Sequence, residues 1–199
     1  ILCFGDSNTW GYIAGSWNPD TQTGAQFEEK FRWPQIMLQA SNQAIELTID
    51  GMPGRTINID HPSQFELNGL KVLKERYALN TYDVIIVALG VNDCKNAYNK
   101  NGKEIAQSLM EQVHYIKTCT PKTKVILVMP PEIKKENGFG DDFKGAIAKS
   151  IEIRKILTTC KLDQALSLDY QLNAIDGVHF CKEDHRQLGL ALAKKSFLR

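Results

Sequence analysis

Four short polar segments carry residue types that could perform nucleophilic chemistry, and two of them hold a complete set for it. Ser7 lies in the segment Gly5-Asp6-Ser7-Asn8, and Asp176 and His179 lie three residues apart near the end of the chain. A serine hydroxyl is a poor nucleophile unless an adjacent base takes its proton and a third group orients that base. We therefore predict Ser7 as nucleophile, His179 as its base and Asp176 as the group that orients the imidazole.

The other two segments offer hydrogen-bond donors. Acyl transfer creates an oxyanion, which needs donors that are already in place. Asn92 brings a side-chain amide, and the backbone N–H groups of Ser7 and Gly54 could supply two more, since glycine allows the backbone to approach closely. These three residues are the predicted oxyanion hole. Asp93 is interpreted as a brace for its loop, because Asn and Asp are favoured before helices.

The elements that must position these residues alternate along the chain. Apolar runs at 1–4, 44–49, 82–90, 124–131 and 165–169 indicate strands, and amphipathic stretches at 31–42, 63–79, 103–118, 142–161 and 183–198 indicate helices. Strands that alternate with helices predict a parallel sheet covered on both faces. Ligands bind beyond the carboxyl ends of such strands. All four polar segments follow strands, so we expect them to converge at one edge of the sheet.

Composition restricts the remaining possibilities. The 199 residues suit one domain, which we place at 1–199, and the net charge of +1 indicates no nucleic-acid or anionic-membrane partner. No apolar run approaches the length of about 20 residues needed to span a bilayer. The five cysteines include no Cys-x-x-Cys pair, which is typical of free thiols in a reducing compartment, so we expect a cytoplasmic protein.

The sequence resembles the SGNH (GDSL-type) hydrolases, in their arylesterase/acyltransferase-like branch. Four blocks match in order: "FGDSNTWG" with Ser7, "GMPGRT" with Gly54, "LGVND" with Asn92, and "DGVHF" with Asp176 and His179. Similarity extends to "RWPQIML", "GRTINIDHP", "LNGLKVL" and "DHRQLGLALA", so the resemblance covers nearly the whole chain. It implies an α/β protein, a flavodoxin-like three-layer α/β/α sandwich with a five-stranded parallel sheet.

The resemblance also implies an activity. It implies hydrolysis of small carboxylic esters, short-chain or aryl, through an acyl-serine, with acyl transfer to alcohols as a variant and with no metal or organic cofactor. The triad and oxyanion-hole roles carry over to the residues assigned above. Asn8 stands where the family's name motif has Leu, which bears on substrate contacts. The branch's tendency to assemble is compatible with a homo-oligomer.

Several alternatives remain open. Trp10, Tyr12 and Trp17, on the loop after the nucleophile, either line a substrate pocket or only hold the loop; with Asn8, we take Trp10 and Tyr12 as candidate substrate contacts. The same triad would serve a carbohydrate O-deacetylase, a lysophospholipase or a thioesterase. A non-catalytic flavodoxin-like ligand-binding module fits the fold, but no phosphate-binding glycine motif follows a strand. A metal site at His179, Cys181 and His185 has no second cluster to complete it.

Overall fold

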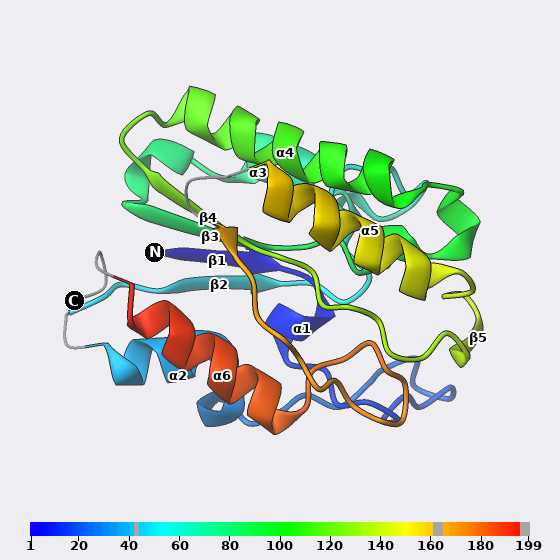
Figure 1. Ribbon diagram of the computed structural model, residues 1–199. Helices are drawn as coiled ribbons and strands as arrows, with labels where there is room; N and C mark the ends of the chain where they lie inside the picture. Colours follow the sequence, from blue (N-terminus) through cyan, green and yellow to red (C-terminus); the bar gives the residue numbers. More distant parts are fainter. Residues whose placement is uncertain (42–43, 161–164, 196–199) are drawn as a thin grey trace.

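A parallel sheet of five strands forms the middle layer of the molecule (Figure 1). The computed structural model describes residues 1–41, 44–160 and 165–195, and within them the strand order is β2-β1-β3-β4-β6. The strands span Leu2–Gly5 (β1), Thr48–Gly51 (β2), Val84–Ala88 (β3), Lys124–Val128 (β4) and Ala165–Leu166 (β6). Within the described residues, each pair of neighbouring strands in this sheet is parallel, which confirms the predicted five-stranded sheet.

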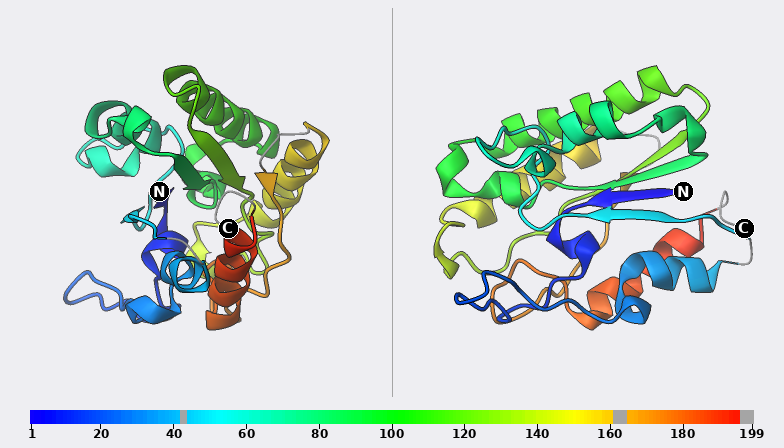
Figure 2. Two further views of the ribbon diagram at one scale, coloured as in Figure 1. Left: turned by 90° about the vertical axis from the view of Figure 1, so that its left-hand side faces the viewer. Right: turned by 180° about the vertical axis from the view of Figure 1, so that it is seen from behind.

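Helices cover both faces of this sheet, as Figures 1 and 2 show. One face carries α3 (Gly69–Arg76), α4 (Gly102–Cys119) and α5 (Ala146–Thr159), and the other carries α2 (Trp33–Ala40) and α6 (Lys182–Ala193). The predicted three-layer α/β/α sandwich is therefore confirmed. Among the described residues, none of the helices combines the length and the apolar character that crossing a lipid bilayer requires.

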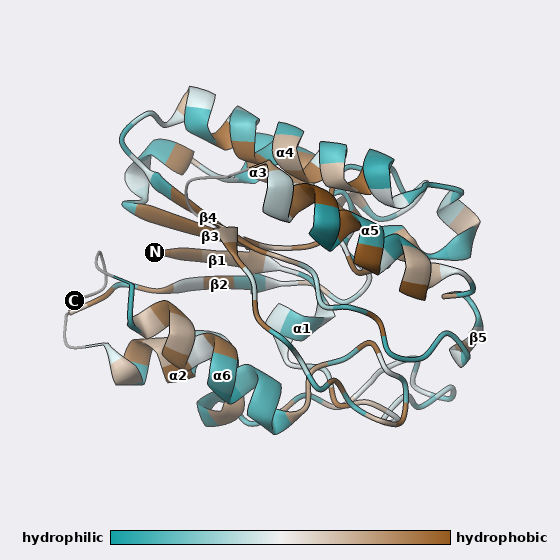
Figure 3. Cartoon of the chain, in the orientation of Figure 1, coloured by the Kyte–Doolittle hydropathy of each residue, from teal (hydrophilic) through white to brown (hydrophobic). Residues whose placement is uncertain are grey.

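The alternation of side chains along the strands explains why both faces need a cover. Leu2 and Phe4 of β1 belong to the core under α3, α4 and α5, whereas Cys3 belongs to the core under α2 and α6. Successive side chains of a strand point to opposite faces, so a strand buried on both faces reads as a continuous apolar run. Figure 3 shows the result, with apolar strands in the middle and polar helix faces outside.

Several element ends differ from the sequence prediction because local caps and register set them. The helix predicted over 63–79 begins only at Gly69, where the Asn68 side chain accepts a hydrogen bond from the Lys71 N–H at 3.0 Å. The strand predicted over 44–49 begins at Thr48, which pairs with Leu2 at the start of β1. The helix predicted over 142–161 begins at Ala146, after Gly145 in the left-handed region with φ 77°. Residues 42, 161 and 196–198 of the predicted helices lie outside the described residues.

One short α-helix and one strand that border the site described below were not predicted from the sequence. The short helix α1 (Ser7–Trp10) follows β1 directly, and β5 (Gly138–Asp141) lies between β4 and α5, outside the five-stranded sheet. Short 3-10 helices connect the larger elements at Glu29–Phe31, Phe65–Leu67, Leu79–Thr81, Asn92–Cys94 and Asn96–Tyr98. Most of these segments lie beyond the periodic apolar pattern on which the prediction depended.

Candidate active site

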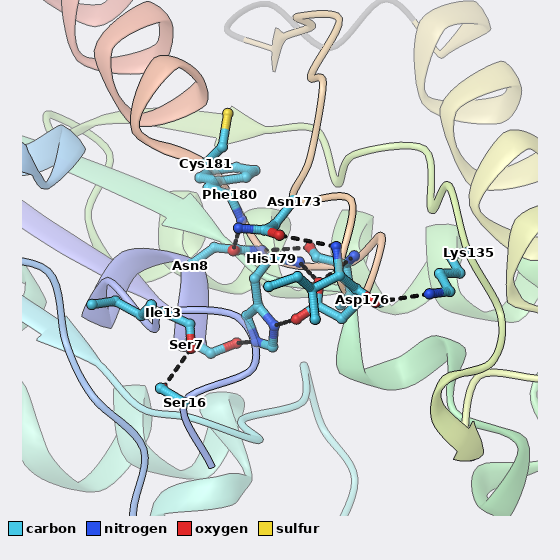
Figure 4. A network of polar contacts seen from close by, with 12 residues as sticks. Ser7, Asn8, Ile13, Ser16, Lys135, Asn173, Asp176, His179, Phe180 and Cys181 are labelled. Atoms are coloured by element: carbon cyan, nitrogen blue, oxygen red, sulfur yellow. Dashed lines mark hydrogen bonds and ion pairs between the residues drawn. The ribbon is translucent and has the colours of Figure 1, made fainter.

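Three of the predicted site residues form one continuous chain of hydrogen bonds (Figure 4). Ser7 is the first residue of α1, at the carboxyl end of β1, and its Oγ lies 2.9 Å from His179 Nε2. His179 Nδ1 lies 2.8 Å from Asp176 Oδ2. All three side chains are buried. A serine, a histidine and an aspartate in this order have the geometry that nucleophilic catalysis by a serine requires.

The Asp176 carboxylate is held by its own turn. Its Oδ1 accepts the backbone N–H groups of Val178 and His179, both at 3.0 Å. Burial acts to raise the pKa of Asp176, but the hydrogen bonds from His179 and from the backbone outweigh it, so the pKa lies below its usual value. The carboxylate is therefore ionised at neutral pH and can orient His179 with a proton on Nδ1.

Glycine at position 177 allows this turn to form against a neighbouring segment. Gly177 has φ 66°, and a Cβ there would come within 2.4 Å of the backbone nitrogen of Lys135. Its carbonyl accepts a hydrogen bond from the Lys134 N–H at 2.9 Å, and its N–H donates to the Asn173 carbonyl at 2.7 Å. The loop that carries His179 is thus closed on itself and attached to the segment after β4.

The residues predicted to donate hydrogen bonds to the oxyanion lie at one cavity. Ser7, Gly54 and Asn92 all line one cavity, and Gly54 is in the left-handed region with φ 85°. The Asn92 Nδ2 donates one hydrogen bond to the Arg55 carbonyl at 3.0 Å. An amide has two N–H groups, so the second remains for a ligand. As the first residue of α1, Ser7 has a backbone N–H without an intrahelical acceptor.

Arg55 is a positioning residue that the sequence analysis did not identify. Its side chain is buried and donates to the carbonyls of Gly5 and Asp50 at 3.1 and 3.0 Å and to that of Glu66 at 2.9 Å. It also pairs with the Asp50 carboxylate at 2.9 Å. These contacts tie the end of β1 to the turn that carries Gly54. In the sequence, the only indication of this role is the position of Arg55 directly after Gly54.

Two buried carboxyl groups brace the same loops. Both oxygens of Asp93 accept the Ile57 N–H, at 3.2 and 3.1 Å, which confirms its interpretation as a structural brace. Asp6 accepts the Asn8 N–H at 2.9 Å and caps α1. Burial raises the pKa of each carboxyl to about 7. Neither carboxyl is hydrogen-bonded to His179. Asp6 and Asp93 therefore stabilise the loops, whereas Asp176 orients the histidine.

Asn8 contacts the histidine loop and does not line the cavity. Its Oδ1 accepts the Phe180 N–H at 2.8 Å, and its Nδ2 donates to the Val178 carbonyl at 3.4 Å, so the carboxamide bridges both neighbours of His179 (Figure 4). Trp10 also lies outside the residues that line the cavity. The predicted substrate contacts of Asn8 and Trp10 therefore gain no support from their position, and Asn8 serves to hold His179 in place.

Replacing Asn8 by leucine, the residue of the family's name motif, tests this role. The Phe180 N–H and the Val178 carbonyl would lose their buried partner, so we expect the free energy of unfolding to fall by about 2 kcal/mol. We expect kcat to fall about tenfold, because His179 lies between the two bonded residues. Urea unfolding and ester hydrolysis would measure both. An unchanged unfolding midpoint would contradict the role assigned to Asn8.

Tyr12 both lines the cavity and contacts the histidine. The ring centroids of Tyr12 and His179 are 4.4 Å apart, and Phe139 of β5 meets His179 edge-on at 5.6 Å. Tyr12 is held in its loop by a bridge to Gln26. Aromatic rings in these arrangements attract an imidazole and shield it from water. Tyr12 thus lies where the sequence analysis expected a substrate contact.

The cavity beside Ser7 has a volume of about 430 Å³, within the range of small-molecule sites. Its apolar wall comprises Tyr12, Trp17, Pro53, Phe139, Phe143, Ile175 and Val178. Trp17 and Ile175 are 56% and 57% exposed, respectively, so they lie at its mouth. The hydrogen-bonded chain of Ser7, His179 and Asp176 therefore opens onto a space with an apolar surface.

His185, considered above as a metal ligand, and Cys94 both lie in the core. His185 is buried, and its Nδ1 accepts the Trp33 N–H at 3.3 Å; burial lowers the pKa of this histidine to about 3. The described part of the chain contains no group of three His, Cys, Asp or Glu residues that could hold a metal ion. Cys94, two residues after Asn92, is buried, and burial raises the pKa of its thiol to about 12. It is therefore a poor nucleophile.

Comparisons with known proteins give a family match and structures of similar fold. A family model described as "GDSL-like Lipase/Acylhydrolase family" matches residues 3–153. The inhibitor-bound structure of an aryl esterase from M. smegmatis is 28% identical, with a TM-score of 0.82 over 98% of this chain and 96% of the other. A carbohydrate acetylesterase from Sinorhizobium meliloti is also 28% identical, with a TM-score of 0.79 over 96% of this chain and 95% of the other.

A more distant structure supports the fold alone. The lipase/acylhydrolase from Enterococcus faecalis is 21% identical, with a TM-score of 0.66 over 98% of this chain and 93% of the other. A comparison with curated protein sequences returns no match.

Proposed function

The chain belongs to the GDSL-like lipase/acylhydrolase family and is an ester hydrolase, and from this premise we propose that it cleaves short-chain or aryl esters through an acyl intermediate on Ser7. The observation that carries the proposal is the unbroken chain from Ser7 Oγ through His179 to Asp176 at the wall of the cavity. Family membership also argues against a non-catalytic ligand-binding module.

The proposed reaction has two halves. The Ser7 hydroxyl attacks the ester carbonyl while His179 Nε2 takes its proton, and Asp176 stabilises the imidazolium that forms. The oxyanion accepts hydrogen bonds from the N–H groups of Ser7 and Gly54 and from the Asn92 amide. His179 then protonates the departing alcohol. A water molecule, activated by the same histidine, releases the acid; another alcohol in its place would give acyl transfer.

Removal of the Asn92 amide tests the oxyanion hole. We expect Asn92→Ala to lower kcat by about 10²–10³, the loss typical of one oxyanion donor. The matched control is Asn96→Ala, at an asparagine that lies outside the cavity wall. Turnover of 4-nitrophenyl acetate by folded protein measures the effect. An Asn92→Ala enzyme as fast as the wild type would contradict the assignment.

The acyl chain length tests the substrate class. A carbohydrate acetylesterase is among the structures that this chain resembles, and an acetyl group is a short acyl chain, which supports a preference for short acyl groups. We therefore expect kcat/KM to be higher for 4-nitrophenyl acetate and butyrate than for the octanoate. A maximum at octanoate would instead favour a lysophospholipase or a thioesterase.

A carbohydrate O-deacetylase is the second candidate. The exposed Trp17 at the mouth of the cavity offers an aromatic face on which a sugar ring could stack, and one structure that this chain resembles is a carbohydrate acetylesterase. Acetate release from acetylated sugars at a higher kcat/KM than from aryl acetates would favour it. The expected homo-oligomer and the cytoplasmic location stay predictions.

A further inference from the structure

We propose that Lys95 binds a negatively charged group on the ester, so that the preferred substrates combine an apolar body with a carboxylate. This inference rests on the proposed function, because it assigns a substrate class to the same cavity. It concerns a residue that the sequence analysis did not single out.

The charges in the cavity wall point to this role. Among the described residues that line the cavity, only Asp176 and Lys95 carry a formal charge at neutral pH when the histidine is neutral. The Asp176 oxygens already accept three hydrogen bonds, from Val178 and from the backbone and ring of His179. Asp176 therefore acts on the histidine, and Lys95 is the cation that faces a ligand.

Lys95 is fixed close to the reacting groups. It directly follows the 3-10 helix Asn92–Cys94, and its backbone N–H donates to the Asn92 carbonyl at 3.1 Å. Its Nζ lies 5.8 Å from the centre of the Phe143 ring, which forms part of the cavity wall. The residue that would hold the oxyanion and the residue that would hold a substrate charge thus belong to one short turn.

The ammonium group keeps most of its capacity for a ligand. Among the described residues, its one ion pair is with Asp142, at 3.9 Å, and the side chains of Lys95 and Asp142 are 28% and 62% exposed. Exposed pairs at this distance contribute little, and a lysine has three N–H donors. By contrast, Lys135 at the edge of the histidine loop already donates to the Ile175 carbonyl at 3.0 Å (Figure 4) and does not line the cavity.

The other residues of the cavity wall indicate that the uncharged part of the ligand is apolar. Around the lysine, the cavity presents aromatic and aliphatic side chains, among them Tyr12, Phe139 and Phe143. A partly buried ammonium beside such a surface favours an anion, since water is partly displaced and the attraction is less screened. The carboxylate can belong to the acyl group or to the alcohol, and the experiment distinguishes the two.

Two matched pairs of esters separate charge from shape. For the acyl side, mono-4-nitrophenyl glutarate is compared with its neutral carboxamide analogue. For the alcohol side, 4-acetoxybenzoate is compared with 4-acetoxybenzamide. The anionic-to-neutral ratio of kcat/KM is measured for each pair with the wild type, Lys95→Met, Lys95→Glu and the control Lys144→Met. Lys144 is exposed and lines a different surface pocket.

We expect the ratio for one of the two pairs to fall about tenfold in Lys95→Met and further in Lys95→Glu, and to stay at the wild-type value in Lys144→Met. The pair that responds identifies the side that carries the charge. The wild-type ratio should also decrease as salt is added. Division by the neutral analogue cancels any general loss of activity or folding.

Ratios that are unchanged by Lys95→Met for both pairs would overturn the proposal for Lys95. If the wild type still hydrolyses the neutral esters and Ser7→Ala does not, the proposed function stands and only this inference fails. If Ser7→Ala hydrolyses the neutral esters at the wild-type rate, the proposed function itself fails.

Discussion

Ser7→Ala is expected to lower kcat for 4-nitrophenyl acetate by about 10⁴- to 10⁶-fold, the largest effect of any single change in this protein. The alanine removes the only hydroxyl within hydrogen-bond distance of His179 Nε2 among the described residues. The reaction would then lose its covalent intermediate. The oxyanion donors and the cavity would remain, so a residual rate above that of water is expected.

Covalent labelling adds an independent readout of the same change. A fluorophosphonate should transfer its phosphonyl group once to the Ser7 hydroxyl of the wild type, with loss of fluoride, and should not label Ser7→Ala; mass spectrometry would detect the added group. Ser63→Ala, at an exposed serine, is the matched control and should keep both activity and labelling. Hydrolysis by Ser7→Ala at the wild-type rate, with folding intact, would show that another group performs the chemistry.

Asp176→Asn is expected to lower kcat by about 10⁴-fold while the fold persists. The amide oxygen can still accept the N–H groups of Val178 and His179, as Asp176 Oδ1 does. The amide nitrogen would then face His179 Nδ1, where the carboxylate oxygen now lies at 2.8 Å. Two donors cannot bond to each other, so the imidazole would turn to the tautomer with its proton on Nε2. That tautomer cannot accept a proton from Ser7.

Two measurements check this explanation. Nitrogen NMR of the histidine ring should place the proton on Nδ1 in the wild type and on Nε2 in Asp176→Asn. Asp20→Asn, at an exposed loop residue, should leave both the spectrum and kcat unchanged. An Asp176→Asn enzyme within tenfold of the wild type would show that the carboxylate is dispensable for the reaction.

The fold could be predicted because burial on both faces leaves a clear pattern. The run through Val84–Ala88 is apolar at every position, since its side chains pack alternately into two cores. The ends of elements were less predictable. Asn68 starts α3 through one hydrogen bond, and Gly145 precedes α5 through one backbone conformation. One hydrogen bond or one backbone conformation does not alter the spacing of apolar residues, so hydrophobic periodicity does not reveal where these helices begin.

The candidate site was only partly predictable for a related reason. The contact of Asn8 with Phe180 joins residues 172 positions apart, and the contact of Arg55 with Gly5 joins residues 50 apart. No spacing along the chain encodes either contact. The sequence alone therefore predicts a substrate contact for Asn8 and assigns no role to Arg55.

The sequence by itself determined the order of strands and helices and the chemical types of the groups at one edge of the sheet. In a parallel sheet, the segments after the strands must meet at that edge, so Ser7, Gly54, Asn92 and His179 could be brought together without coordinates. Only the tertiary structure decided that Tyr12 lies against the histidine and that Lys95 lines the cavity. Those contacts depend on how loops without periodic patterns pack against one another, and that packing is decided only when the whole chain has folded.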